Sequence, residues 1–60
     1  MSAASDFYLS QAESCMATAD ATGLAQVRDQ NLRAASAWQG MADRVIRMED
    51  ARAEKARAAS

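Results

Sequence analysis

The fold of this chain is decided by residues 24–48, which read LAQVRDQNLRAASAWQGMADRVIRM. Alternating steps of three and four residues, starting from Leu24, select a row in which seven of eight side chains are apolar. This spacing places the side chains on one face of an α-helix. The row comprises Leu24, Val27, Asn31, Ala34, Trp38, Met41, Val45 and Met48. A second, weaker row beside it widens the apolar arc enough to contact two neighbours, and comprises Leu32, Ala35, Ala42 and Ile46.

The preceding segment has the same helical spacing. Ser5 or Asp6 is expected to cap the start of this helix, because a short side-chain oxygen can accept hydrogen bonds from free backbone N–H groups. Gly23 is expected to end it, since glycine readily adopts the left-handed conformation that often closes a helix. The apolar row of this first helix comprises Tyr8, Leu9, Ala12, Cys15, Met16 and Ala19.

These patterns predict one all-α domain over residues 1–60, an antiparallel helical hairpin with a longer second helix. The expected elements are a helix over about 5–21, a tight turn at 22–24 and a helix over about 25–57. At 1.5 Å per residue the helices are roughly 25 Å and roughly 50 Å long. The second helix therefore extends well past the first.

The length mismatch predicts which side chains meet. Phe7 and Tyr8 should reach about as far as Trp38 to Met41. Beyond that point, Val45, Ile46 and Met48 are expected to have no partner within their own chain. An apolar row without a partner normally contacts another surface, so we expect a dimeric four-helix bundle or docking on a larger protein.

Composition leads to the same expectation. Half of the 60 residues are apolar, but sixteen of them are alanine, so few bulky side chains are available for a core. So small a chain usually needs a disulfide, a metal or self-association for stability. One cysteine and no histidine provide neither an internal disulfide nor a zinc site. Because proline is absent and β-branched residues are few, a β fold is excluded.

Several functional classes lack their usual signals. The sequence contains no set of catalytic or metal-binding residues and no phosphate-binding loop, so we expect neither an enzyme nor a cofactor. No apolar run is long enough for a membrane span, and the start MSAASDFYL lacks the features of a signal peptide. We therefore expect a cytoplasmic protein that does not bind membranes.

The leading hypothesis is a non-enzymatic protein–protein interaction module that self-associates, as a homodimer, or docks as an accessory subunit. Trp38 is interpreted as the anchor of the core, with an exposed aromatic platform as the alternative. The predicted protein interface comprises Trp38, Met41, Val45, Ile46 and Met48. The alternative function is a small RNA- or DNA-binding regulator, whose paired second helices would present Arg44, Arg47, Arg52 and Arg57 to phosphates.

Three single residues each have two interpretations. Cys15 is either a small buried apolar group or half of an intermolecular disulfide. Asn31 either sets the register of packed helices or is solvated. Gly40 is either a tolerated surface glycine or a point where another helix crosses closely, and a kink there is also considered. Four ion pairs are expected along the second helix: Asp29–Arg33, Asp43–Arg47, Glu49–Arg52 and Glu54–Arg57.

Two runs of residues carry a resemblance. The first is Tyr8-x3-Ala12-x2-Cys15-x3-Ala19, and the second, after Arg28, is Ala35-x2-Trp38-x3-Ala42. Together they resemble small uncharacterised helical-hairpin proteins of alphaproteobacteria, which implies a fold rather than an activity. In length and two-helix plan the chain also resembles the plasmid RNA-binding protein Rop, whose hairpins dimerise into a four-helix bundle.

Overall fold

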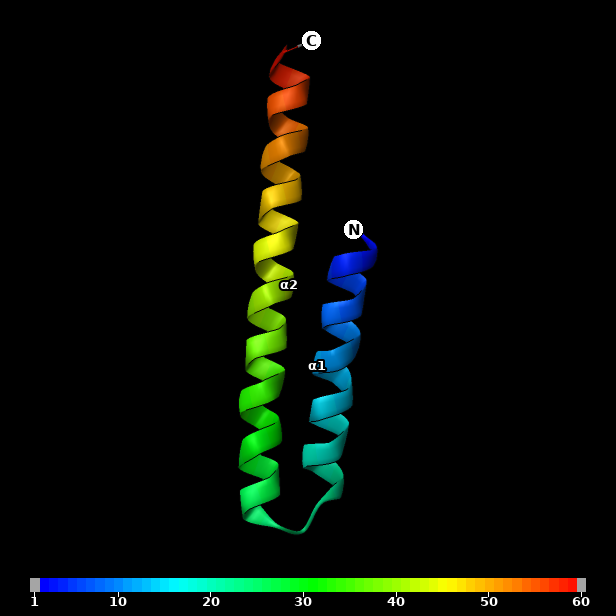
Figure 1. Ribbon diagram of the computed structural model, residues 1–60, viewed down its shortest axis with the longest axis vertical. Helices are drawn as coiled ribbons and strands as arrows, with labels where there is room; N and C mark the ends of the chain where they lie inside the picture. Colours follow the sequence, from blue (N-terminus) through cyan, green and yellow to red (C-terminus); the bar gives the residue numbers. More distant parts are fainter. Residues whose placement is uncertain (1, 60) are drawn as a thin grey trace.

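The computed structural model describes residues 2–59, which form two helices joined by a short turn (Figure 1). Helix α1 spans Ala3–Ala21 and helix α2 spans Ala25–Ala59. α1 lies antiparallel along residues 25–49 of α2, so the start of α1 is beside the part of α2 that contains Ile46 and Glu49 (Figure 1). The resulting rod measures 54 × 15 × 11 Å. The predicted all-α hairpin with a longer second helix is confirmed.

α1 starts earlier than the predicted boundary because Ser2, not Ser5 or Asp6, is its N-cap. The Ser2 hydroxyl accepts a hydrogen bond from the Ser5 backbone N–H at 3.3 Å, and the Ser5 hydroxyl accepts one from the Ser2 N–H at 3.1 Å. This reciprocal pair is a capping box that satisfies two otherwise free donors. Ser5 therefore lies inside the helix, where its buried hydroxyl also donates to the Ser2 carbonyl oxygen.

The turn at residues 22–24 is fixed by Thr22 rather than by a left-handed glycine. Thr22 is the extended C-cap of α1, and its N–H donates to the Thr18 carbonyl oxygen at 3.1 Å. Its hydroxyl accepts from the Leu24 N–H, and its carbonyl oxygen accepts from the Arg28 guanidinium at 3.2 Å. No glycine has a positive φ, so the expected left-handed conformation of Gly23 is wrong. Thr22 supplies the hydrogen bonds that such a glycine would have provided.

The two helices meet along small side chains spaced seven residues apart. The fully buried side chains of residues 2–59 are Ser5, Ala12 and Ala19 on α1, and Ala35 and Ala42 on α2. Residues seven apart lie on nearly the same side of a helix, since two turns take about 7.2 residues. Small groups at every second turn let two helices pack closely, because the separation depends on the side chains at the contact.

The side of α2 that faces α1 is therefore rotated about the helix axis relative to the predicted row. Leu24 is 67% exposed and Met48 is 56% exposed, whereas Ala35 and Ala42 of the weaker row are buried. No bulky apolar side chain of residues 2–59 is buried; each is half-buried or exposed. Large side chains would hold the helices apart at the line of closest approach, so they lie beside that line instead.

The unpaired end of α2 is also more polar than expected. α1 reaches far enough for Ser2 to lie near Ile46 and Glu49, and both Val45 and Ile46 are half-buried. The prediction that Ile46 has no partner within the chain is wrong, because it lies beside Ser2, while Met48 is exposed as expected. The segment beyond α1 is residues 50–59, which are exposed and contain alanine and charged groups only. This end of α2 therefore offers no apolar row to a partner.

Substituting Ala42→Leu tests the small-residue contact. Ala42 is completely buried, so a leucine there must push the helices apart, and such overpacking typically costs about 1–3 kcal/mol. We expect a fall of that size in the free energy of unfolding, measured by urea denaturation followed by circular dichroism. The control is Ala51→Leu at an exposed position past α1, where we expect a change below about 0.5 kcal/mol. Equal effects of the two substitutions would contradict the packing described.

Candidate functional site

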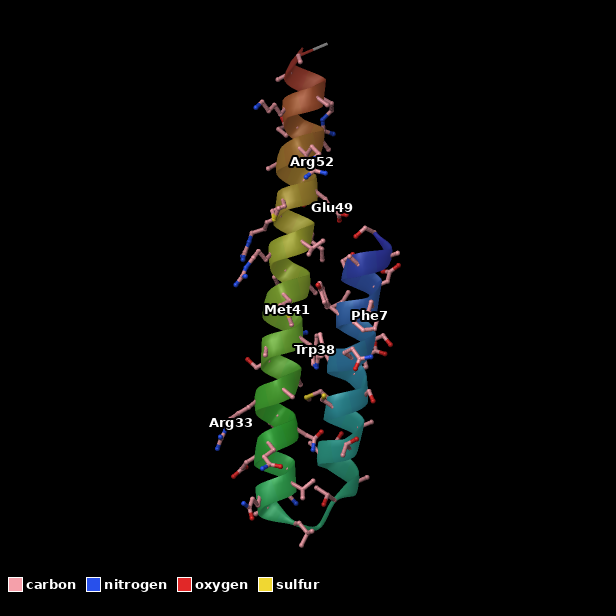
Figure 2. All side chains as sticks on the ribbon, in the orientation of Figure 1. Phe7, Arg33, Trp38, Met41, Glu49 and Arg52 are labelled. Carbon is pink, nitrogen blue, oxygen red and sulfur yellow. The ribbon has the colours of Figure 1, made fainter. Side chains whose placement is uncertain are left out.

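Three aromatic rings form a cluster of side chains between the helices. Trp38 of α2 stacks on Tyr8 of α1, with ring centroids 5.8 Å apart and planes at 26°. Phe7 meets the edge of Trp38 at 6.0 Å and 89°, and also contacts Tyr8 at 5.8 Å. Both geometries are favourable for aromatic pairs. The predicted reach of Phe7 and Tyr8 to Trp38 is confirmed (Figure 2).

The cluster is only partly enclosed by the hairpin. Phe7 is 53% exposed, while Tyr8 and Trp38 are half-buried. Trp38 thus contributes to the contact between the helices, as predicted, but part of its ring still faces solvent. The aromatic cluster therefore extends from the contact between the helices to the surface of the hairpin.

The hairpin has two flanks, one on each side of the line along which the helices meet. Because the positions that face this line repeat every seven residues, other residues can be assigned to one flank or the other by the same spacing. One flank carries a shallow groove of about 480 Å³ that includes Leu9, Met16 and Gln39. A second groove of about 360 Å³ includes Ser2 and Ile46. Ser2 precedes Leu9 by seven residues, and Ile46 follows Gln39 by seven. The two grooves therefore lie on the same flank.

This flank is bordered by carboxylates from both helices, and we call it the acidic face. Glu13 and Asp20 line the larger groove, and Asp50 lines the smaller one. The other acidic residues of this face are identified by the seven-residue repeat. The repeat places Asp6 in line with Glu13, and Asp29 and Asp43 in line with Asp50. The face thus comprises apolar residues Leu9, Met16, Leu32 and Ile46 between the acidic rows Asp6, Glu13, Asp20 and Asp29, Asp43, Asp50.

The opposite flank has a different composition, and we call it the methionine face. Figure 2 views this side, with Met41 and Phe7 toward the reader. The seven-residue repeat adds Val27, Ala34 and Met48 in line with Met41. None of these positions is acidic, and the charged groups one helical turn from Met48 are the basic residues Arg44 and Arg52. The methionine face therefore comprises Phe7, Val27, Ala34, Met41 and Met48.

The structure divides the predicted protein interface among three places. Trp38 contacts the rings of α1, and Val45 follows it by seven residues on the same side of α2. Met41 and Met48 belong to the methionine face, and Ile46 belongs to the acidic face. Phe7, Leu9, Met16 and Leu32 are not among the predicted interface residues. The signal that could have found the acidic face is the spacing of Asp6, Glu13 and Asp20 by seven residues.

The four arginines of the alternative function do not share one face. Arg44, Arg47, Arg52 and Arg57 follow one another at intervals of three, five and five residues, which spreads them around the helix. Arg57 forms an ion pair with Glu54, one of the four predicted pairs; the other three are absent from the ion pairs of residues 2–59. A phosphate backbone therefore meets no continuous basic surface on one hairpin.

The three residues with two interpretations are placed as follows. Cys15 is a free, half-buried thiol. The Asn31 side chain is half-buried and donates to the Val27 carbonyl oxygen of its own helix at 2.9 Å. Gly40 is exposed in an uninterrupted helix, and a Cβ there would meet nothing within 4 Å. Gly40 is therefore not a close contact point within the hairpin.

Comparisons with protein-family models, with curated proteins and with solved structures found no match. Within residues 2–59, no three histidine, cysteine or acidic side chains are grouped so that they could hold a metal ion. Neither helix, over the same residues, combines the length and apolar character that a membrane span requires.

Substituting Trp38→Ala tests the aromatic cluster. A core tryptophan typically contributes about 3–5 kcal/mol, and a half-buried one roughly half of that. We expect the free energy of unfolding to fall by about 2 kcal/mol, measured by denaturation followed by circular dichroism. The control is Leu24→Ala at the turn, where the side chain is 67% exposed and the expected change is below about 0.5 kcal/mol. A Trp38→Ala change no larger than the control would contradict the contact with Phe7 and Tyr8.

Proposed function

We propose that this hairpin is a non-enzymatic protein–protein interaction module that pairs with a second copy of itself. The observation that supports the proposal is the identity of its buried side chains, which are one serine and four alanines in residues 2–59. These groups bury little apolar surface, and the free energy gained is roughly proportional to that surface. A stable fold of this size requires a further source of buried area.

The methionine face is the surface best suited to self-association. It holds Met41 and Met48 of α2 beside Phe7 of α1, and both Met48 and Phe7 are more than half exposed. Two copies meeting through this face bring no carboxylates together, whereas two acidic faces would repel each other. A two-fold axis through the methionine face gives each copy the same contacts and produces a closed four-helix bundle.

The side chains of Met41 and Met48 and the edge of the Phe7 ring are suited to a contact between two copies. Methionine has an unbranched, polarisable side chain that fills irregular gaps and favours contacts with aromatic rings. Pairing would cover the exposed edge of Phe7 and complete the burial of the aromatic cluster with Tyr8 and Trp38. The aromatic cluster then becomes part of one core shared by four helices.

Two matched substitutions test the proposal, because Met41 and Ile46 lie on opposite flanks of α2. A glutamate in place of Met41 would bury a charge in the proposed interface, so Met41→Glu should shift the protein to monomer at concentrations where the wild type is dimeric. Ile46→Glu adds the same charge to the acidic face and should leave the dimer intact. The measurement is the mass in solution by sedimentation velocity and light scattering.

The two variants distinguish self-association through the methionine face from self-association through the acidic face. Dissociation caused by Ile46→Glu but not by Met41→Glu would assign self-association to the acidic face and contradict the interface proposed. A wild-type protein that is monomeric at the highest concentration measured would contradict self-association itself.

A further inference from the structure

The acidic face combines an apolar floor with charges of one sign. Leu9 and Met16 lie along the larger groove with Glu13 and Asp20 beside them, and Met16 is 46% exposed. Ile46 and Asp50 continue the same face in the smaller groove. From Ser2 to Asp20, α1 provides a surface about 27 Å long, given a rise of 1.5 Å per residue. A partner helix of about 18 residues matches that length.

The charges form two rows that border the groove. Asp6, Glu13 and Asp20 follow one edge on α1, and Asp29, Asp43 and Asp50 follow the other edge on α2. The seven-residue repeat places one basic residue, Arg57, in line with the second row, and it forms an ion pair with Glu54. Arg33 and Arg47 each follow an aspartate of the α2 row by four residues, whereas α1 contains no basic residue, so the potential over the groove is most negative along the α1 edge.

We propose that the acidic face binds an amphipathic basic helix of a partner protein. Such a helix would place its apolar side chains on Leu9, Met16 and Ile46 and its lysines or arginines beside the two acidic rows. Docking of an apolar helix face into a groove is a common mode of peptide recognition, and complementary charges set orientation and specificity. This inference goes beyond the proposed self-association, which uses the opposite face.

Other occupants are disfavoured by the same charges. A second copy presenting its own acidic face would bring six carboxylates against six, and nucleic acid would be repelled. A metal ion is a poor occupant because the carboxylates of residues 2–59 do not form a group able to bind one. A basic partner helix satisfies both the apolar floor and the acidic edges.

The test uses a synthetic probe of stated chemistry. The probe is a fluorescein-labelled 18-residue helical peptide with leucines on one face and lysines on the other, and binding to the full chain is followed by fluorescence anisotropy. We expect saturable binding that weakens as salt is added, because screening reduces the attraction between the lysines and the acidic rows. A peptide of the same pattern with glutamate in place of lysine should not bind.

Two matched variants place the binding site. Met16→Lys puts a positive charge in the acidic face, and Ala51→Lys adds the same charge at an exposed position of α2 that belongs to neither face. We expect Met16→Lys to weaken peptide binding at least tenfold, and Ala51→Lys to change it less than twofold. Circular dichroism of each variant verifies that both remain helical.

The outcomes for the two faces are distinguishable. Equal weakening by both variants would mean attraction to overall charge rather than to this groove, and would overturn the inference. Absence of saturable binding by the wild-type protein would also overturn it. Peptide binding that is lost in Met16→Lys, by a protein that is monomeric throughout, would support the inference while contradicting the proposed self-association.

Discussion

The close contact between small side chains is the constraint on which the rest of this structure depends. Ala12 and Ala19 of α1 meet α2 along the same line as Ala35 and Ala42, and nothing larger than serine or alanine is buried within residues 2–59. Alanine at every second turn lets the helices lie side by side, but it contributes little apolar surface. The geometry of the hairpin is thus set by residues that stabilise it only weakly.

The displaced bulky side chains account for the two surfaces of the molecule. Since they cannot occupy the line of closest approach, Met41 lies on one flank and Met16 on the other, and neither is buried. The carboxylates are concentrated on only one flank, so the two surfaces differ in charge although both are apolar in part. The packing of α1 against α2 therefore produces two sides that differ in charge, and the proposed self-association and the proposed binding of a basic helix each use one of them.

The overall plan could be predicted from sequence because helical spacing and chain reversal are local signals. Phe7 meets Trp38 as the helix lengths predict, and the turn falls at residues 22–24. The rotation of α2 could not be predicted in the same way. The largest apolar residues usually mark the buried side of a helix. In α2, however, Ala42 lies at the centre of the buried side and Met48 is exposed. The pattern that records this rotation is the seven-residue spacing of the small residues, Ser5, Ala12 and Ala19 on α1 and Ala35 and Ala42 on α2.

We propose that folding depends on a second copy, because the buried side chains of one hairpin are one serine and four alanines within residues 2–59. The most direct test of this proposal is the midpoint of thermal unfolding, followed by circular dichroism over a hundredfold range of protein concentration. When folding and association are coupled, the midpoint rises with concentration by mass action. We therefore predict a higher unfolding temperature at each higher concentration. An unfolding temperature that is the same at every concentration, for a protein that is fully helical when dilute, would contradict the account.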